Sequence, residues 1–73
     1  MNFKFIESKP GVCGGKPCFA GTRIPVHIIL EMMGAGDTIE DILKAYPQLT
    51  KEHILEGIRF AAELLNYEEA TIT

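Results

Sequence analysis

Apolar side chains recur with helical spacing in three stretches of the chain. The first helix is predicted from Pro25 to about Met33, because proline suits the first helical position and the residues after it are apolar on nearly every side. A second helix is predicted after the N-cap Thr38 and ends before Pro47. A third, the longest, follows the N-cap Thr50. The pattern therefore indicates a mainly helical domain.

The third predicted helix carries two apolar stripes and one polar strip. We assign one stripe to the core of the domain, and it consists of Ile54, Ile58, Ala61, Ala62 and Leu65. The other stripe begins near His53 and consists of Gly57, Phe60, Leu64 and Tyr67. The strip predicted to face solvent consists of Glu52, Glu56, Arg59, Glu63 and Asn66.

Two apolar stripes and an apolar first helix exceed what so small a unit can cover by itself. We therefore expect a symmetric homodimer whose interface contains Gly57, Phe60, Leu64 and Tyr67, with the glycine allowing close approach of another backbone. The alternative is that the N-terminal strand and hairpin of the same chain fold over this stripe.

The N-terminal part is predicted to be a short strand and a hairpin. Residues 3–6 alternate weakly and favour a strand, and the double glycine at 14–15 favours a tight turn between residues 12–13 and 18–19. Residues 1–24 then form a strand and a Gly/Pro-rich hairpin, and residues 25–73 a three-helix, helix-turn-helix unit, within one domain overall.

The composition is that of a folded, globular chain. Hydrophobic residues make up 47% and charged residues 23% of the 73 positions. The apolar runs are too short to cross a bilayer, and no basic-then-apolar leader opens the sequence. We therefore expect a soluble, cytoplasmic protein without a membrane partner.

Charge is divided unevenly along the chain, whose net charge is −3. Residues 1–30 contain four basic side chains and one acidic one, whereas residues 31–73 contain three basic and nine acidic ones. Contacts with an anionic partner are thus expected from the first part. The predicted contact residues are Lys16, Thr22 and Arg23. For Arg23 a salt bridge to an acid of the second helix is an equal alternative.

The same stretch contains residues whose backbone properties fit a stiff loop. Gly14, Gly15 and Gly21 are predicted to set its geometry, together with Pro25. The glycines also allow a phosphate to bind to backbone N–H groups, although a Gly-Lys-Pro order is not that of a P-loop.

The candidate reactive side chains do not form a known catalytic or metal-binding pattern. Cys13 and Cys18 are four residues apart, and His27 and His53 lie on different predicted helices, unlike the paired ligands of zinc sites. We expect ordinary thiols, no metal, no cofactor and no enzymatic activity. A disulfide between the two cysteines is geometrically conceivable, but a reducing compartment opposes it.

The second and third predicted helices have the layout of a helix-turn-helix. The exposed strip of the third helix is mostly acidic, so phosphate repulsion opposes simple docking into the major groove. Only Lys51, His53 and Arg59 could assist there.

Four segments together resemble the bacterial "domain of unknown function 433" family. They are Val12-Cys13-Gly14-Gly15-Lys16-Pro17, Gly21-Thr22-Arg23-Ile24-Pro25-Val26, Ile39-Glu40-Asp41-Ile42-Leu43 and Tyr46-Pro47-Gln48-Leu49-Thr50. The resemblance implies a small, homeodomain-like helix-turn-helix fold. It also implies the antitoxin of a type II toxin-antitoxin pair, with a PIN-like ribonuclease as the toxin and operator DNA as a further ligand. The competing expectation is a DNA-binding or protein-interaction module with no toxin partner.

Three features depart from the resemblance. Cys18 and Phe19 occupy positions where the family often has aliphatic residues, and Ala20 stands where a basic residue is common. Only residues 68–73 follow the third helix, whereas antitoxins of this general type often carry a long segment that wraps the toxin. The folded surface itself would then have to hold the toxin, with Lys16 or Arg23 competing for its metal-binding carboxylates.

Overall fold

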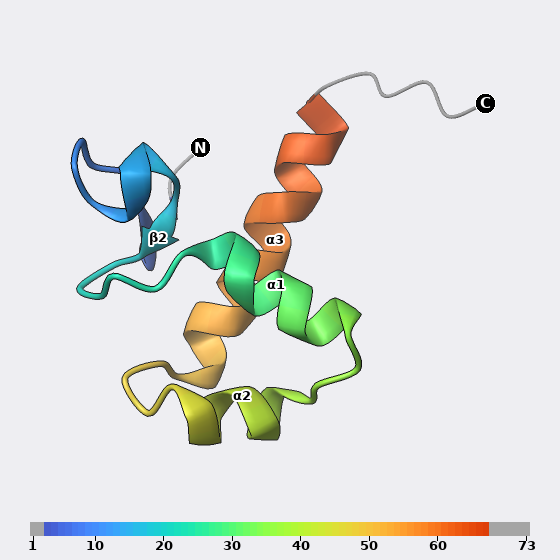
Figure 1. Cartoon of the computed structure of the whole chain (residues 1–73). Coiled ribbons are helices and arrows are strands. Elements are labelled where there is room, and N and C mark those ends of the chain that lie inside the picture. Colours follow the sequence, from blue (N-terminus) through green and yellow to red (C-terminus); the bar gives the residue numbers. More distant parts are fainter. Residues whose placement is uncertain (1–2, 68–73) are drawn as a thin grey trace.

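Three helices pack against one another in pairs and are preceded by a small hairpin (Figure 1). The computed structural model describes residues 3–67, with side chains up to residue 66. The elements in chain order are β1 (Ile6–Glu7), the 3-10 turn η1 (Cys13–Gly15), β2 (Cys18–Phe19), α1 (Val26–Gly34), α2 (Ile39–Ala45) and α3 (Lys51–Tyr67). The predicted class, mainly helical with a short N-terminal β element, is confirmed.

The ends of α1 follow from local sequence signals. Pro25 is its N-cap, one position before the predicted one, with φ −66° and ψ 141°. At the other end Gly36 adopts φ 105°, and its N–H donates to the carbonyl of Met33 at 3.0 Å, while the N–H of Asp37 donates to Met32 at 3.0 Å. Glycine tolerates this left-handed conformation and so reverses the chain towards α2.

The start of α2 is fixed by a capping box. The Thr38 hydroxyl accepts the N–H of Asp41 at 3.1 Å, and a carboxylate oxygen of Asp41 accepts the N–H of Thr38 at 3.0 Å. These bonds occupy backbone donors that a helix start leaves without partners. Hydrogen bonding to Thr38 lowers the pKa of Asp41, because it favours the ionised carboxylate.

Replacing Thr38 by Ala is expected to lower the free energy of unfolding by about 1 kcal/mol, which is the usual value of such a cap. Urea denaturation followed by circular dichroism measures the loss. The contribution of Asp41 is present at neutral pH and is lost as the pH falls through its lowered pKa. The difference between wild type and Thr38→Ala should therefore shrink in acid, and a difference that grows in acid would contradict this role.

The strand pairing differs from the predicted hairpin. β2 pairs antiparallel with β1, with Ile6 opposite Phe19 and Glu7 opposite Cys18. Residues 12–13 do not form the partner strand, because Cys13–Gly15 turns as a 3-10 segment. The double glycine thus shapes the connection of a wider hairpin. The local pattern of apolar residues does not show which distant segments pair, whereas two adjacent glycines directly indicate a turn.

The N-terminal segment contributes to the same core as the helices. Phe19 is completely buried and belongs to a cluster whose other members are Ile24, Val26, Ile29, Ile42, Leu49 and Ile54. Gly57 of α3 makes room for its ring, since a Cβ at Gly57 would lie 3.2 Å from Phe19 Cε1 and Cζ. Gly57 is therefore buried inside the chain, which corrects its predicted place in an oligomer interface.

Each of the two stripes of α3 is partly buried and partly exposed, unlike the prediction. On the stripe assigned to the core Ile54 is completely buried, as predicted, and on the other stripe Leu64 is 47% exposed. His53 and Phe60, on the stripe expected to face another chain, are partly buried, and Phe60 packs edge-on against Phe3 with ring centroids 5.3 Å apart. On the stripe assigned to the core, Ile58 is 38% exposed and Leu65 is 71% exposed. The N-terminal segment covers part of the stripe that contains His53 and Phe60. This is the alternative that the sequence left open. The side chain of Tyr67 lies outside the described residues.

Glu56 also departs from its predicted position on the solvated strip. Its side chain is only 6% exposed, and its Oε1 accepts the backbone N–H of Phe5 at 3.2 Å. The N-terminal segment crosses α3 at this point, so a carboxylate at the border of the apolar stripe holds the two together. A buried polar group of this kind needs such a partner.

Candidate partner-binding site

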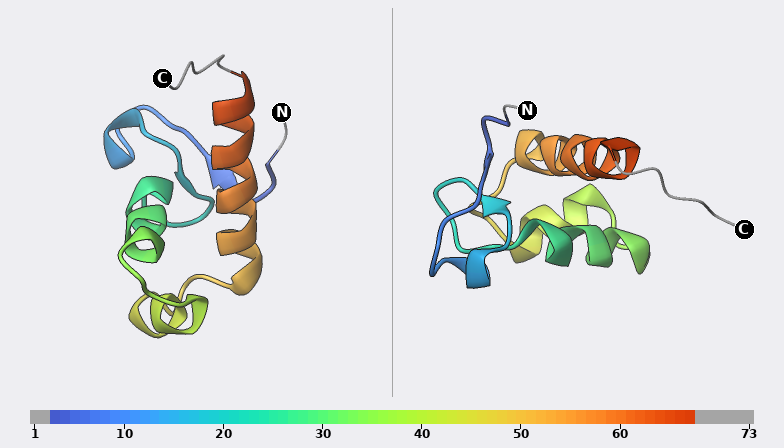
Figure 2. Two further views of the ribbon diagram at one scale, coloured as in Figure 1. Left: turned by 90° about the vertical axis from the view of Figure 1, so that its right-hand side faces the viewer. Right: turned by 90° about the horizontal axis from the view of Figure 1, so that it is seen from above.

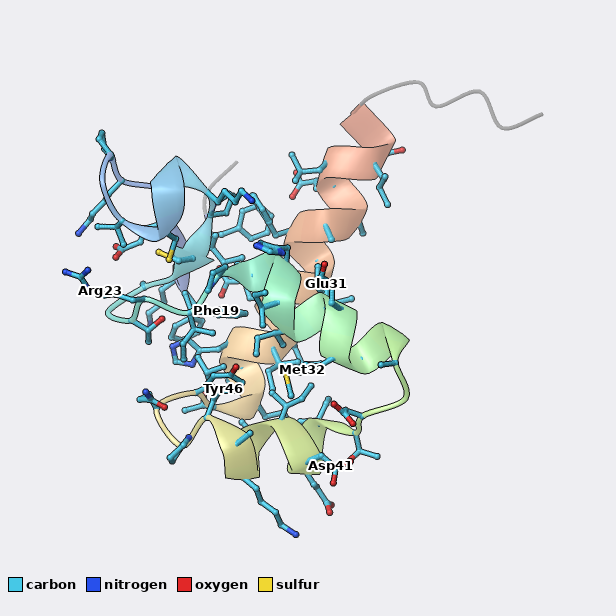
Figure 3. All side chains as sticks on the ribbon, in the orientation of Figure 1. Phe19, Arg23, Glu31, Met32, Asp41 and Tyr46 are labelled. Carbon is cyan, nitrogen blue, oxygen red and sulfur yellow. The ribbon has the colours of Figure 1, made fainter. Side chains whose placement is uncertain are left out.

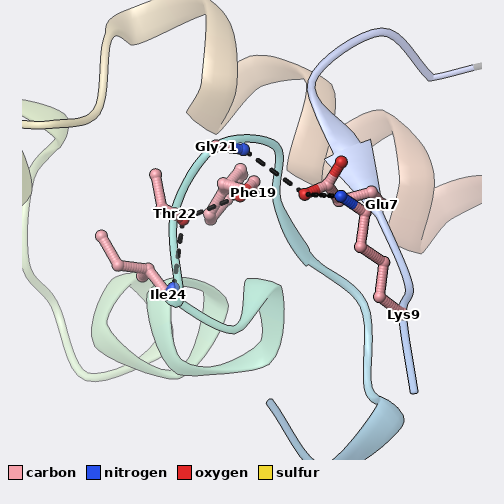
Figure 4. A network of polar contacts seen from close by, with 6 residues as sticks. All are labelled: Glu7, Lys9, Phe19, Gly21, Thr22 and Ile24. Carbon is pink, nitrogen blue, oxygen red and sulfur yellow. Dashed lines mark hydrogen bonds and ion pairs between the residues drawn. The ribbon is translucent and has the colours of Figure 1, made fainter. Parts of the chain in front are cut away.

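The turn that contains Thr22 and Arg23 is held by its own hydrogen bonds (Figure 4). The Thr22 hydroxyl donates to the carbonyl of Phe19 at 2.8 Å and accepts the N–H of Ile24 at 3.1 Å. Gly21, at φ 78°, donates its N–H to Glu7 Oε1 at 3.4 Å. Thr22 thus lies in the interior of the turn, and its hydroxyl already donates one hydrogen bond and accepts another.

Arg23 is exposed at the outer end of this turn, and its side chain points away from the helices (Figure 3). Within residues 3–67 it forms no ion pair, so the predicted alternative of a salt bridge to the second helix is not present there. The guanidinium is free to contact an anionic group, and the rigid turn beneath it fixes where that contact can occur.

Lys16 lies on a different part of the surface from Arg23, at the end of η1. Gly14 and Gly15 have φ values of 64° and 80°, and the Gly15 carbonyl accepts the Ser8 hydroxyl at 2.7 Å. The Lys16 N–H donates to the Cys13 carbonyl at 3.1 Å, which closes the turn. The side chain of Lys16 is exposed. The predicted cations therefore do not converge on one point.

A groove of about 340 Å³ runs between α1 and the C-terminal half of α3. Figure 2 shows these two helices side by side, with the N-terminal loop at one end. The groove is lined by Lys16 and Pro17 from the loop, Val26, His27 and Leu30 from α1, and Phe60, Ala61 and Leu64 from α3. Six of the eight lining side chains are apolar, and the two basic ones, on Lys16 and His27, are both exposed.

The two histidines have different surroundings. His27 lies at the groove, and its Nδ1 is 3.5 Å from a carboxylate oxygen of Glu31. His53 lies between aromatic rings, with centroid distances of 4.7 Å to Phe5 and 5.9 Å to Phe19, and its Nδ1 accepts the N–H of Thr50. His53 is thereby used in the fold, which weakens its predicted help in DNA contact.

The groove was not predicted from the sequence. Phe60 and Leu64 were expected to meet a second copy, and Lys16 was expected to contact an anionic partner, but the structure brings all three to one depression. The i, i+4 spacing of Phe60 and Leu64 was a signal that they share a face. The position of the loop beside that face depends on long-range packing.

Neither a metal site nor a membrane-spanning helix is found in the part of the chain that the structure describes. In residues 3–67 no three His, Cys, Asp or Glu side chains come together in a way that could hold a metal ion. In the same residues no helix has the length and hydrophobicity needed to cross a membrane.

Comparison with known proteins finds a matching family model and a curated relative. A family model described as "Protein of unknown function (DUF433)" matches residues 6–61. The uncharacterized protein y4eO of Sinorhizobium fredii (strain NBRC 101917 / NGR234) is 37% identical over 51 residues, which are 70% of this chain and 23% of that protein. The chain thus spans about a quarter of the length of this curated relative.

A solved structure supports the same relationship. The crystal structure of a DUF433 member protein from Anabaena variabilis superimposes with a TM-score of 0.80 at 30% identity. The match covers 86% of this chain and 62% of the other. The region matched by the family model, residues 6–61, includes the hairpin, α1, α2 and the first part of α3, but it ends before Leu64 of the groove.

Proposed function

The chain belongs to the DUF433 family of proteins of unknown function, and from this premise we propose that it is a non-enzymatic, antitoxin-like binding protein. Its groove between α1 and α3 receives an apolar segment of a PIN-like ribonuclease and thereby neutralises this toxin. The observation that carries the proposal is the groove itself, an apolar depression with exposed Lys16 at its end.

The groove has the chemistry of a protein-anchoring site. Its lining is mostly apolar, and Leu64, one of the lining residues, is 47% exposed. Inserting one or two apolar side chains of a partner would remove this surface from water, at about 25 cal/mol per Å² of apolar area. Anchors of this kind supply most of the affinity of small interfaces.

The charge around the groove favours an acidic partner. Lys16 carries a positive charge beside the apolar floor, whereas Arg23 presents a second cation on another part of the surface, outside the residues that line the groove. A PIN-like nuclease site is rich in carboxylates that hold metal ions. A cation from the antitoxin competes with those ions, so the same contact gives specificity and inhibition.

The proposal requires a PIN-like ribonuclease gene beside the gene of this chain, and inhibition of that enzyme is the test. The purified protein should abolish RNA cleavage at about one copy per nuclease, and Arg23→Ala should weaken binding without lowering the free energy of unfolding. Loss of stability with unchanged affinity would make Arg23 a scaffold residue. Full cleavage in the presence of excess protein would contradict the antitoxin role and leave an interaction module with no toxin partner.

Binding of operator DNA is measured in the same preparation with a labelled promoter fragment. The acidic strip of α3 opposes DNA contact by this helix, so binding should depend on the N-terminal cations and weaken steeply with salt. DNA binding that persists after replacement of Lys16 and Arg23 would contradict their assignment.

We also propose that the chain forms a homodimer, through a different part of α3 from that expected at first. Ile58, Ala62 and Leu65 are exposed and lie on one face of the helix. Leu65→Asp should therefore reduce the mass measured by analytical ultracentrifugation to that of the monomer, because a carboxylate cannot be buried in an apolar interface. A wild-type protein that is already monomeric at high concentration would contradict the homodimer.

A further inference from the structure

A second, smaller depression adjoins the groove. It has a volume of about 150 Å³ and is lined by Phe3, Ile6, Glu7, Ser8, Pro17 and Phe60. Pro17 and Phe60 also line the groove between α1 and α3, so the two depressions meet at these two side chains. A partner segment that leaves the groove past Pro17 and Phe60 therefore enters the second depression, beside β1.

The boundary between the two depressions is held in place by the fold. The carbonyl of Pro17 accepts the N–H of Val26 at 3.0 Å, which ties Pro17 to the first residue of α1. The Phe60 ring packs edge-on against Phe3 at a centroid distance of 5.3 Å. Both depressions are therefore formed in the free chain, and a partner does not have to order this part of the surface on binding.

The two depressions differ in the sign of the charge beside them. Among the described residues, the charged or ionisable side chains that line the groove are the basic ones of Lys16 and His27, and the one that lines the second depression is Glu7. Glu31 lies 3.5 Å from Nδ1 of His27 and offsets a charge on that ring, so Lys16 is the effective cation of the groove. One end of the combined surface is thus positive and the other negative.

The Glu7 carboxylate uses one of its two oxygens within the fold. Its Oε1 accepts the N–H of Gly21 at 3.4 Å and lies 3.5 Å from Lys9 Nζ (Figure 4). The Lys9 side chain is 61% exposed, so this ion pair is weak. Within residues 3–67 the other oxygen, Oε2, takes part in no hydrogen bond or ion pair. It can accept a donor of a bound segment, and a basic side chain gives the stronger, charge-assisted bond.

We propose that the groove and the second depression together recognise a short linear peptide segment with two apolar side chains, one for each depression. An acidic residue lies beside the apolar side chain in the groove, and a basic residue lies beside the one in the second depression. The apolar side chains supply the affinity. The charges fix the direction of the segment, because a reversed segment would bring like charges together. This inference rests on the proposed function, since it defines the chemistry of the partner segment that the groove receives.

The test uses the full chain and a phage-displayed library of random peptides as the probe, so it needs no ribonuclease. The selected peptides should share two apolar positions, with an acidic residue near one and a basic residue near the other. In a nuclear magnetic resonance titration, a synthetic peptide of this sequence should shift the backbone amide signals of Leu30 and Ala61 in the groove and of Ile6 and Ser8 in the second depression. Peptides without this charge pattern, or shifts confined to the groove, would overturn the inference.

Single replacements test each charge separately. Lys16→Glu, at an exposed position, should weaken binding of the selected peptide about fivefold, and a new selection on this variant should enrich a basic residue in place of the acidic one. Glu7→Gln keeps an oxygen that can accept the Gly21 N–H, and it should weaken binding only of peptides that retain the basic residue.

Lys44→Glu is the matched control, because it makes the same change at an exposed position of α2 that lines neither depression. It should alter neither the affinity nor the selected sequence. Equal losses of affinity in Lys16→Glu and Lys44→Glu would show a general effect of net charge and contradict the inference.

Failure of this inference is distinguishable from failure of the proposed function. Inhibition of the ribonuclease with no charge pattern in the selected peptides would overturn the inference and leave the proposed function in place. The charge pattern without inhibition of the ribonuclease would support recognition of the peptide segment and contradict the antitoxin role.

Discussion

Phe19→Ala is expected to lower the free energy of unfolding by about 3–5 kcal/mol, the range for removing a fully buried aromatic ring. The ring is completely buried, fills the space above Gly57 and meets the His53 ring edge-on at a centroid distance of 5.9 Å. Because small domains are stable by only about 5–15 kcal/mol, this change removes much of the total. Urea denaturation at 25 °C measures this loss of stability, with circular dichroism at about 222 nm reporting the helix content.

Phe3→Ala is the matched control for this measurement. Phe3 is only partly buried, and its main aromatic contact is the edge-on pair with Phe60. A pair of this kind is worth about 0.5–1.5 kcal/mol beyond the area it buries. If both replacements have the same effect, Phe19 is not the point at which the hairpin and the helices share a core.

Leu64→Asp is expected to weaken binding of the PIN-like ribonuclease about 30-fold or more, the effect of losing a central interface anchor. Leu64 lines the groove and is half-exposed, so a carboxylate there meets the apolar segment of the partner without disturbing the core. The free energy of unfolding should change by about 1 kcal/mol at most, as for other surface replacements. Isothermal titration calorimetry with the metal-free nuclease gives the affinity.

Leu65→Asp provides the matched control, because it makes the same chemical change one residue further along α3. Leu65 is 71% exposed and does not line the groove. Ribonuclease binding should be unchanged in Leu65→Asp, whereas self-association should be unchanged in Leu64→Asp. Loss of ribonuclease binding in both variants would mean that the groove is not the specific site.

The helices could be predicted because their ends are determined locally. Thr38 and Asp41 form a capping box within four residues, and Gly36 provides the reversal that ends α1. The α3 start is similar, since the Thr50 hydroxyl accepts the N–H of His53 at 3.4 Å. Each signal lies in the same few residues as the structure it produces, so one sequence suffices to find it.

The surfaces of α3 could not be predicted in the same way. Periodicity showed two apolar stripes but not which of them the N-terminal segment would cover. The outcome depends on Phe19 packing over Gly57, and on Phe5 donating its N–H to Glu56, contacts that join residues more than 35 positions apart. The pair Glu56 and Gly57 at the edge of a stripe does not by itself indicate that the N-terminal segment crosses α3 there.

The candidate site could be predicted only in part, because it too depends on long-range contacts. Lys16 and Arg23 were chosen for their charge, and both are exposed, whereas Thr22 has its hydroxyl engaged inside the turn. The loop geometry is local and was visible in the glycines. The groove forms only where this loop meets α1 and α3, and this meeting is a property of the whole fold.

If the α1–α3 groove receives a PIN-like ribonuclease, as we propose, a nuclear magnetic resonance titration with the metal-free nuclease will locate the contact. The largest changes in backbone amide shifts should fall on Lys16, Leu30, Ala61 and Leu64, which surround the groove. The absence of any change at saturating nuclease, or changes confined to α2, would contradict the proposal.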